Sequence, residues 1–431
     1  MITSEKSAPD GSKKGVFSLR RLFKSGFWSI ADQGLFAVSN FIINIFLARW
    51  LSLNDYGAFA ASFSVFLLLG TLHTAIITEP LLIYGSGKYR DRYNEYIANL
   101  FQGHIFFTAG IGILLLLISL ILYFSGQSIF SQAFLGLSIA QPFILLSWLL
   151  RRTCYTRFVP RIAAFAGLGY LFITILGIFF LYTLNLLSPL TALMLMGIAS
   201  LIVSLWMMAV LFPIHIFYPF KKIEREMLLL HLKYGKWSLP SSALTWIPAN
   251  IYYVLLPFQG KVEIVAILRA QNNLLMPLLQ FNTALATQII PIFVQYKGTD
   301  IFRKLFWGLL IFLNFLALAF WFGLNFFRND IILCLYGDNF ISHGEVLMIL
   351  GFLPLLTGII AVLGGIIRAN DHPEQVFWSY LFASIVSLTA GIWLMHTGGL
   401  IEVAIAIVLS YSVVVVIMGY FNLRDHKSLL Y

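Results

Sequence analysis

Residues 41–59 read FIINIFLARWLSLNDYGAF, and this stretch decides how the rest of the chain is interpreted. It joins two apolar runs through a short polar turn that begins at Arg49. Asp55 stands at the start of the second run, where negative charge stabilises the amino-terminal end of a helix. The stretch therefore predicts two apolar helices joined by a tight turn.

Similar apolar runs continue in both directions. The chain has 431 residues, of which 60% are hydrophobic and only 11% charged, against about 25% charged residues in soluble domains. A membrane-spanning helix needs about 20 apolar residues, and lipid-exposed strands leave backbone groups unsatisfied. We therefore expect an all-α polytopic membrane protein of about twelve spans, at residues 26–48, 56–84, 95–123, 127–149, 160–183, 187–211, 237–258, 264–294, 305–326, 345–367, 375–395 and 401–422.

The distribution of basic residues gives an independent test of these spans. Cytoplasmic loops carry an excess of Lys and Arg. With the amino terminus inside, all but four of the 28 Lys and Arg residues fall in inside segments. The exceptions are Arg49, Lys261 and Arg328 in outside turns and Arg269 within a span. The pattern predicts an even number of spans with both termini cytoplasmic, and it assigns the net charge of +10 to membrane orientation rather than to nucleic-acid binding.

The middle of the chain is its one clear break. Residues 213–236 include a charged run, KKIERE at 221–226, followed by MLLL, which predicts an amphipathic cytoplasmic helix at the membrane surface. An ordinary loop is the alternative. We therefore expect these parts: a basic cytoplasmic tail at 1–25, a six-helix bundle at 26–212, the linker at 213–236, a second six-helix bundle at 237–422 and a cytoplasmic tail at 423–431.

A weak internal repeat supports two related halves. Residues 254–267 read VLLPFQGKVEIVAI, again an apolar run, a polar turn and an acid before a second run. Glu263 therefore takes the place that Asp55 has in the first half. Internal repeats of this kind are typical of transporters.

The stretch 41–59 also resembles the amino-terminal signature of polysaccharide flippases in the multidrug/oligosaccharidyl-lipid/polysaccharide exporter superfamily. Arg49, Asp55, Tyr56 and Gly57 carry the resemblance. It implies two six-helix bundles around a central cavity, in the inner membrane of a bacterium. It also implies a lipid-linked oligosaccharide as cargo, with membrane lipids and other proteins of polysaccharide assembly as partners.

Polar residues inside the spans identify a candidate cargo site, because such residues are costly in lipid unless they face a cavity or a partner. One face of the eighth span is polar, and Arg269 is suited to bind a pyrophosphate. The alternative is a packing stripe, with Arg269 reaching outward to the interface. The predicted cargo-binding residues of this span are Arg269, Asn272, Asn273, Gln280, Thr283 and Thr287.

The first span has a similar polar line, formed by Gln33, Asn40 and Asn44. We assign these residues to the same cargo cavity. Asn side chains also hydrogen-bond neighbouring helices in membranes, so packing is an equal alternative.

A second polar group is predicted near the cytoplasmic end of the first bundle. Asp32, His73 and His104 are the candidate residues for coupling transport to protons or sodium, with Glu79 and Gln102 nearby. Histidine changes its charge near neutral pH, which suits a proton relay. The alternative is that the histidines are hydrogen-bonded core residues and that Glu79 lies at the interface.

No enzyme signature occurs in a suitable context. The sequence has no His-Glu-x-x-His, no phosphate-binding loop and no serine elbow, and two distant cysteines form no metal pattern. We therefore expect a flippase with no resident cofactor, and no enzyme. A proton- or sodium-coupled drug/cation antiporter of the same superfamily is the alternative, followed by a membrane-bound sugar polymerase or ligase.

Overall fold

The computed structural model of the chain describes residues 19–85, 87–212 and 225–425. The side chains of residues 19–26, 287 and 425 lie outside the described part. Every regular element in the described ranges is a helix, which confirms the predicted all-α polytopic fold.

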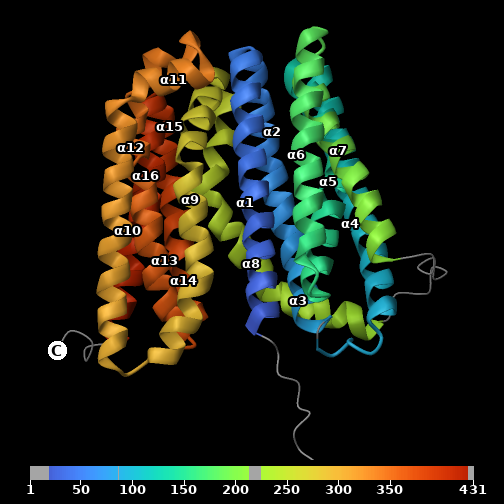
Figure 1. Cartoon of the computed structure of the whole chain (residues 1–431). Coiled ribbons are helices and arrows are strands. Elements are labelled where there is room, and N and C mark those ends of the chain that lie inside the picture. The colour runs from blue at the N-terminus through green and yellow to red at the C-terminus, as the bar shows by residue number, and fades with distance from the viewer. Residues whose placement is uncertain (1–18, 86, 213–224, 426–431) are drawn as a thin grey trace, which may run out of the picture.

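The helices form two side-by-side groups of long, nearly parallel rods (Figure 1). The first group holds the amino-terminal half of the chain. A π-helical turn, η2, interrupts its second rod, because five residues there bond one residue further along than in an α-helix. The elements of this group are α1 (Leu19–Trp50), α2 (Leu53–His73), η2 (Thr74–Thr78), α3 (Glu79–Tyr84), α4 (Tyr93–Phe124), α5 (Ser128–Thr156), α6 (Pro160–Thr183) and α7 (Pro189–Leu211).

The second group contains the carboxy-terminal half. Its rods are again long, and short helices connect them at the end of the molecule that carries α11 (Figure 1). Its elements are α8 (Arg225–Leu255), η3 (Leu256–Gln259), α9 (Val262–Tyr296), α10 (Asp300–Phe326), α11 (Arg328–Tyr336), η4 (Asp338–His343), α12 (Val346–Leu350), α13 (Leu353–Ala369), α14 (Pro373–Val386), η5 (Ser387–Gly391), α15 (Ile392–Thr397) and α16 (Leu400–Asp425).

Eleven helices of the described part are long and apolar enough to cross a membrane. The predicted seventh span is not among them. Its helix, α8, has 31 residues and is long enough to cross, but polar side chains and two prolines make it less apolar. The helical membrane fold is therefore as predicted. Among the long helices of the described part, α8 is the one that is not apolar enough to be identified as a span.

The second part of the predicted linker and the predicted seventh span form one continuous helix. α8 begins at Arg225 and continues without a break to Leu255, so Lys236 is not a helix boundary. The reason is packing, because Met227, His231 and Gly235 are buried on one face of this helix. The first part of the linker, residues 213–224, lies outside the described residues, as do most of the tail at 1–25 and residues 426–431.

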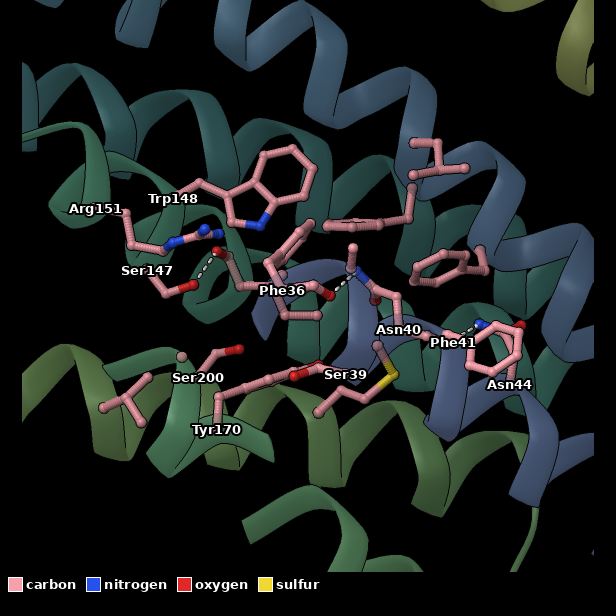
Figure 2. Close-up of a pocket in the computed structure, with 18 of the residues that line it drawn as sticks. Phe36, Ser39, Asn40, Phe41, Asn44, Ser147, Trp148, Arg151, Tyr170 and Ser200 are labelled. Carbon is pink, nitrogen blue, oxygen red and sulfur yellow. Dashed lines mark hydrogen bonds between the residues drawn. The ribbon is translucent and has the colours of Figure 1, made fainter. Parts of the chain in front are cut away.

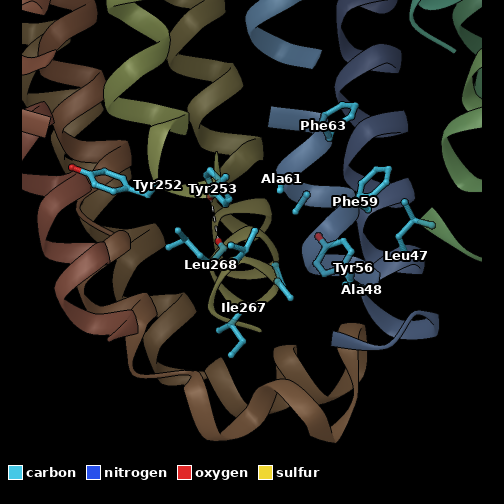
Figure 3. Packing of buried hydrophobic residues seen from close by; sticks show 14 of the residues in the cluster. Leu47, Ala48, Tyr56, Phe59, Ala61, Phe63, Tyr252, Tyr253, Ile267 and Leu268 are labelled. Atoms are coloured by element: carbon cyan, nitrogen blue, oxygen red, sulfur yellow. Dashed lines mark hydrogen bonds between the residues drawn. The ribbon is translucent and has the colours of Figure 1, made fainter. Parts of the chain in front are cut away.

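The two halves of the chain share a hydrophobic core at one end of the molecule. We call the end that carries α11 and the α1–α2 turn the outer end, following the orientation that the sequence predicts. Tyr56, Phe59 and Phe63 follow one face of α2, and Tyr253 and Leu268 lie opposite them on α8 and α9 (Figure 3). These side chains are buried, so this core holds the two halves together toward the outer end.

Polar contacts add to this core. The guanidinium of Arg49 donates to the carbonyl of Cys334 in α11. The ammonium of Lys261 donates to the carbonyls of Met395 and Gly398, at 2.9 and 2.8 Å. A cation at the carboxy-terminal end of a helix, here α15, satisfies carbonyls that have no partner within the helix. Two of the basic residues predicted for outside turns therefore cross-link the outer end.

Candidate functional site

A cavity of about 140 Å³ lies within the first group of helices, with α9 as its remaining wall (Figure 2). Its other lining residues come from α1, α2, α5, α6 and α7. No Asp or Glu is among the described residues that line it. The lining residues used below are Phe36, Asn40, Asn44, Phe66, Ser147, Trp148, Arg151, Tyr170, Ser200, Arg269, Asn273 and Gln280.

Two of the three polar residues predicted for the first span line this cavity. Asn40 and Asn44 are four residues apart, so they share one face of α1. Each donates to a carbonyl one turn earlier in the same helix: Asn40 to Phe36 at 3.1 Å and Asn44 to Asn40 at 2.8 Å. Gln33 is exposed and does not line the cavity.

Asp32 forms a buried ion pair that the sequence did not reveal. Its carboxylate accepts from Arg151 Nε at 3.1 Å and from Arg151 Nη2 at 2.9 Å. The hydroxyl of Tyr155 donates to the same carboxylate at 2.6 Å. Asp32 is 0% exposed. The pair thus joins α1 to α5 and leaves the carboxylate fully bonded.

Arg269 connects the two halves at the outer part of the cavity. It is 4% exposed, and its Nε donates to Asn44 Oδ1 at 3.3 Å. Its guanidinium lies 5.1 Å from the ring centre of Phe63 and 6.0 Å from that of Tyr253, within the range of cation–π attraction. Within the described part of the chain, Arg269 has no ion pair.

Asn273 lies one turn further along α9 and makes a second contact with α1. Its amide donates to the carbonyl of Phe41 at 3.1 Å and to the hydroxyl of Tyr336 at 3.3 Å. Tyr336 in turn donates to the carbonyl of Ala270 at 2.9 Å. Arg269 and Asn273 therefore both line the cavity and hold α1 against α9.

Of the other polar residues predicted on this face of α9, one lines the cavity and two make contacts elsewhere. Gln280 lines the cavity and is exposed. Asn272 is half-buried and hydrogen-bonds Tyr253. Thr283 is exposed and donates to the carbonyl of Leu279 in its own helix. The side chain of Thr287 lies outside the described residues.

The predicted ion-coupling residues do not form one contacting group. His73 and His104 are buried and meet each other, with 3.1 Å between His73 Nε2 and His104 Nδ1. His104 also hydrogen-bonds the carbonyl of Pro142. His73 Nδ1 is buried and has no hydrogen-bond partner among the described residues. Neither histidine lines the cavity, and neither is among the partners of Asp32.

Glu79 instead joins the first group to the inner part of α8. Its carboxylate accepts from Ser238 Oγ at 2.8 Å and from the hydroxyl of Tyr234 at 3.2 Å. One turn earlier on α8, His231 Nδ1 lies 2.7 Å from the carbonyl of Ile76, in η2. The π-helical turn thus presents the carbonyl of Ile76 to α8, and the start of α3 presents the carboxylate of Glu79.

A surface ion pair continues this inner contact outside the membrane. Lys88 Nζ lies 2.6 Å from Glu226 Oε1, and both side chains are exposed. The hydrogen bond raises the pKa of Lys88 and lowers the pKa of Glu226. Both groups therefore keep their charges over the physiological range.

Sequence reasoning missed the residues of α5 and α7 that line the cavity. We placed Arg151 in a cytoplasmic loop, because the fourth span was expected to end at residue 149. α5 continues to Thr156, which brings Arg151 into the wall. One signal was available: a carboxylate inside a span, here Asp32, requires a cationic partner.

No group of three or more His, Cys, Asp or Glu side chains in the described residues is arranged to hold a metal ion. What the cavity offers instead is aromatic rings, amides, hydroxyls and arginine. Such a site binds and orients a ligand through hydrogen bonds and charge. These features, on a polytopic helical fold, define a membrane protein with a ligand cavity between its helices.

The fold is that of transporters of the MOP superfamily. The structure of a multidrug resistance MATE family transporter of this superfamily, in its inward-facing conformation, matches with a TM-score of 0.78 at 15% identity, over 93% of this chain and 99% of that one. The lipid II flippase MurJ, in an inward closed conformation, matches with a TM-score of 0.67 at 15% identity, over 95% of this chain and 88% of that one.

A third structure, an outward-facing conformation of a multidrug resistance MATE family transporter, matches with a TM-score of 0.58 at 14% identity, over 95% of this chain and 96% of that one. No protein-family model and no curated protein matches the sequence. The chain therefore has the MOP fold, and its cargo has to be inferred from its own residues.

Proposed function

We propose that this protein is a transporter that flips a lipid-linked, polyprenyl-pyrophosphate oligosaccharide from the cytoplasmic to the outer leaflet by alternating access. We place it in a bacterial inner membrane, with both termini cytoplasmic, where it serves the synthesis of a cell-surface polysaccharide. The observation that carries the proposal is the charge of the cavity: Arg269 lines it, and no described Asp or Glu does.

The two arginines that line the cavity differ in whether their positive charge is paired with a carboxylate. Arg151 is neutralised by the carboxylate of Asp32. Arg269 has one hydrogen bond to a neutral amide and no ion pair among the described residues. A guanidinium has five N–H donors in a fixed fork, and a buried charge without a counter-ion is costly in a membrane. An anionic cargo such as a pyrophosphate supplies the missing charge and the acceptors.

The arrangement of the two halves supports entry of the cargo from the inner side. The backbone fits the inward-facing transporter better than the outward-facing one, with TM-scores of 0.78 and 0.58. The core around Phe59 and the polar contact between Arg49 and Cys334 join the two halves at the outer end. Polyprenyl-linked sugars are assembled on the inner leaflet in the pathway that we propose.

A drug/cation antiporter is the competing function, since it shares the fold. A cationic cargo needs a carboxylate that is free to bind it. The carboxylate of Asp32, which pairs with the lining residue Arg151, already accepts three hydrogen bonds. The cavity therefore favours an anionic cargo over a cationic one.

Binding of undecaprenyl pyrophosphate is expected to depend on Arg269. In nanodiscs, Arg269→Ala should weaken its affinity by about ten- to hundredfold, since a hydrogen bond to a charged group contributes about 1.5–3 kcal/mol. Arg269→Lys should lose less, because it keeps the charge. Titration followed by the shift in melting temperature measures the effect.

The matched control is Arg303→Ala, which removes an exposed arginine at the start of α10 and should leave binding unchanged. Ethidium, a cationic dye, serves as the competing ligand. Binding of ethidium but not of undecaprenyl pyrophosphate by the wild type would favour the antiporter. Equal loss of pyrophosphate binding in Arg269→Ala and Arg303→Ala would remove Arg269 from the site.

A further inference from the structure

We propose that the part of the cavity enclosed by α1, α5, α6 and α7 is a subsite for one uncharged sugar ring of the cargo. The sugar subsite consists of Phe36, Asn40, Ser147, Trp148, Tyr170 and Ser200 (Figure 2). This inference rests on the proposed function and adds which part of the cargo these residues hold.

Two buried polar atoms of the subsite lack partners. Ser200 Oγ and Trp148 Nε1 make no hydrogen bond with any described residue, although both are shielded from solvent. Ser200 is 1% exposed. A buried polar group without a hydrogen-bond partner is costly, so the two atoms are suited to a ligand with hydrogen-bonding groups. A lipid chain has none to offer, whereas a sugar has several hydroxyls.

The walls between these atoms are aromatic. Trp148 meets Phe36 at 6.1 Å and Phe66 at 5.5 Å between ring centres, in edge-to-face geometry. Gly70 makes room for Trp148, since a Cβ at Gly70 would lie 2.7 Å from the indole ring. The ring is therefore held in place. Rigid aromatic surface beside hydrogen-bonding groups matches a pyranose, which has apolar C–H faces and polar edges.

The subsite carries no free charge. Arg151, which lines the cavity beside the subsite, is paired with Asp32 and lies 4.5 Å from the ring centre of Phe36. Arg269, which has no ion pair among the described residues, donates to Asn44. Phe36 and Asn44 are eight residues apart on α1, which corresponds to about 12 Å along the helix axis. The pyrophosphate and the sugar ring are therefore assigned to opposite ends of the cavity.

The size of the cavity agrees with a single ring. At about 140 Å³ it is smaller than the roughly 300–1,000 Å³ of pockets that enclose a drug-sized ligand. It has no room for a whole oligosaccharide with its lipid. The remainder of the cargo must lie outside the subsite, with the pyrophosphate toward Arg269 on α9.

Protection of an engineered thiol tests the subsite directly. The reporter is Asn40→Cys in a Cys154→Ala/Cys334→Ser chain, labelled with N-ethylmaleimide in nanodiscs, because Asn40 lines the cavity and is only half-buried. Undecaprenyl pyrophosphate linked to glucose, galactose or N-acetylglucosamine is added, and the sugar-free lipid is added in parallel. We expect at least one of the three sugar lipids to slow labelling by about tenfold, and the sugar-free lipid to leave it unchanged.

Equal protection by the sugar-free lipid would overturn the assignment, since the subsite would then hold the pyrophosphate or the chain. No protection by any lipid, although the lipids shift the melting temperature, would show that only water fills the subsite while leaving the proposed function intact. If no lipid shifts the melting temperature either, the proposed function fails as well.

A transport measurement gives a second, independent readout. Trp148→Phe keeps the aromatic wall but removes the N–H, and Ser200→Ala removes the hydroxyl. Each should slow flipping of the protected sugar lipid by about five- to hundredfold, the range that corresponds to 1–3 kcal/mol, without changing flipping of the sugar-free lipid. Ser412→Ala is the control, because Ser412 bonds only within its own helix. Equal slowing of both lipids would contradict the proposal.

Discussion

Asp32→Asn is expected to lower the free energy of unfolding by about 3–5 kcal/mol, the range for breaking a buried ion pair on one side. The substitution leaves Arg151 without its counter-ion beside the cavity, and it replaces one of the two oxygens that accept from Arg151 and Tyr155 with an N–H donor. The melting temperature of purified protein in detergent should fall clearly. This is one of the two largest effects that the structure predicts.

The double variant Asp32→Asn/Arg151→Gln separates charge from packing. Because both charges are then absent, it should recover most of the stability that either single variant loses. The control is Arg92→Gln, which removes an exposed pair with Glu95 and should cost at most about 1 kcal/mol. A double variant as unstable as Asp32→Asn alone would show that the ion pair is not what stabilises the α1–α5 contact.

Asp32→Asn, together with His73→Gln, also tests whether these residues couple transport to protons. Asp32, His73 and His104 were predicted as a proton-coupling group, and the structure gives Asp32 different neighbours from the histidines. Flipping by Asp32→Asn and by His73→Gln should therefore be compared across a pH gradient. A wild-type pH dependence in both variants would remove these residues from the coupling step.

The second large effect is expected at Gly57. A Cβ at this position would lie 2.5 Å from the carbonyl oxygen of Val262 and 2.7 Å from Val262 Cγ1, so the backbones of α2 and α9 meet there. Gly57→Val adds three carbons to a packed seam, which costs about 1–3 kcal/mol in a closely packed core. In the alternating-access cycle that we propose, this cost falls on the state in which the outer end is closed.

A difference of about 1–3 kcal/mol between two conformations shifts their ratio by about 5- to 150-fold. Spin labels at Leu184 and Phe326, exposed residues at the outer ends of α6 and α10, report this shift as a longer distance in Gly57→Val. Gly110→Val is the matched control, because nothing lies within 4 Å of a Cβ there. Equal distances in Gly57→Val and the wild type would contradict the assignment of this seam to the outer closure.

Local sequence patterns were sufficient for much of the fold. Long apolar runs predict the helices because lipid leaves the backbone no other way to satisfy its hydrogen bonds. Spacing along one helix placed Asn40 with Asn44, and Arg269 with Asn273, on shared faces. All four residues line the cavity. These features depend on one helix at a time.

The features that were missed depend on which helices meet. The pairing of Arg151 with Asp32 needs α5 beside α1, and no spacing within either helix encodes that contact. α8 was divided at Lys236 because its inner part is polar, yet the partners of that part, Ile76 and Glu79, come from the first group of helices. Ser200 was overlooked because a single serine in an apolar run carries no periodic signal.

The most direct test of the account is flipping of a fluorescent undecaprenyl-pyrophosphate oligosaccharide by the wild-type protein in proteoliposomes, read with an impermeant quencher. Ethidium efflux is measured in the same vesicles. We predict protein-dependent flipping of the lipid-linked sugar and no ethidium efflux, with flipping slowed by Arg269→Ala. Ethidium efflux without flipping would contradict the account, since it would mean that this cavity carries cations.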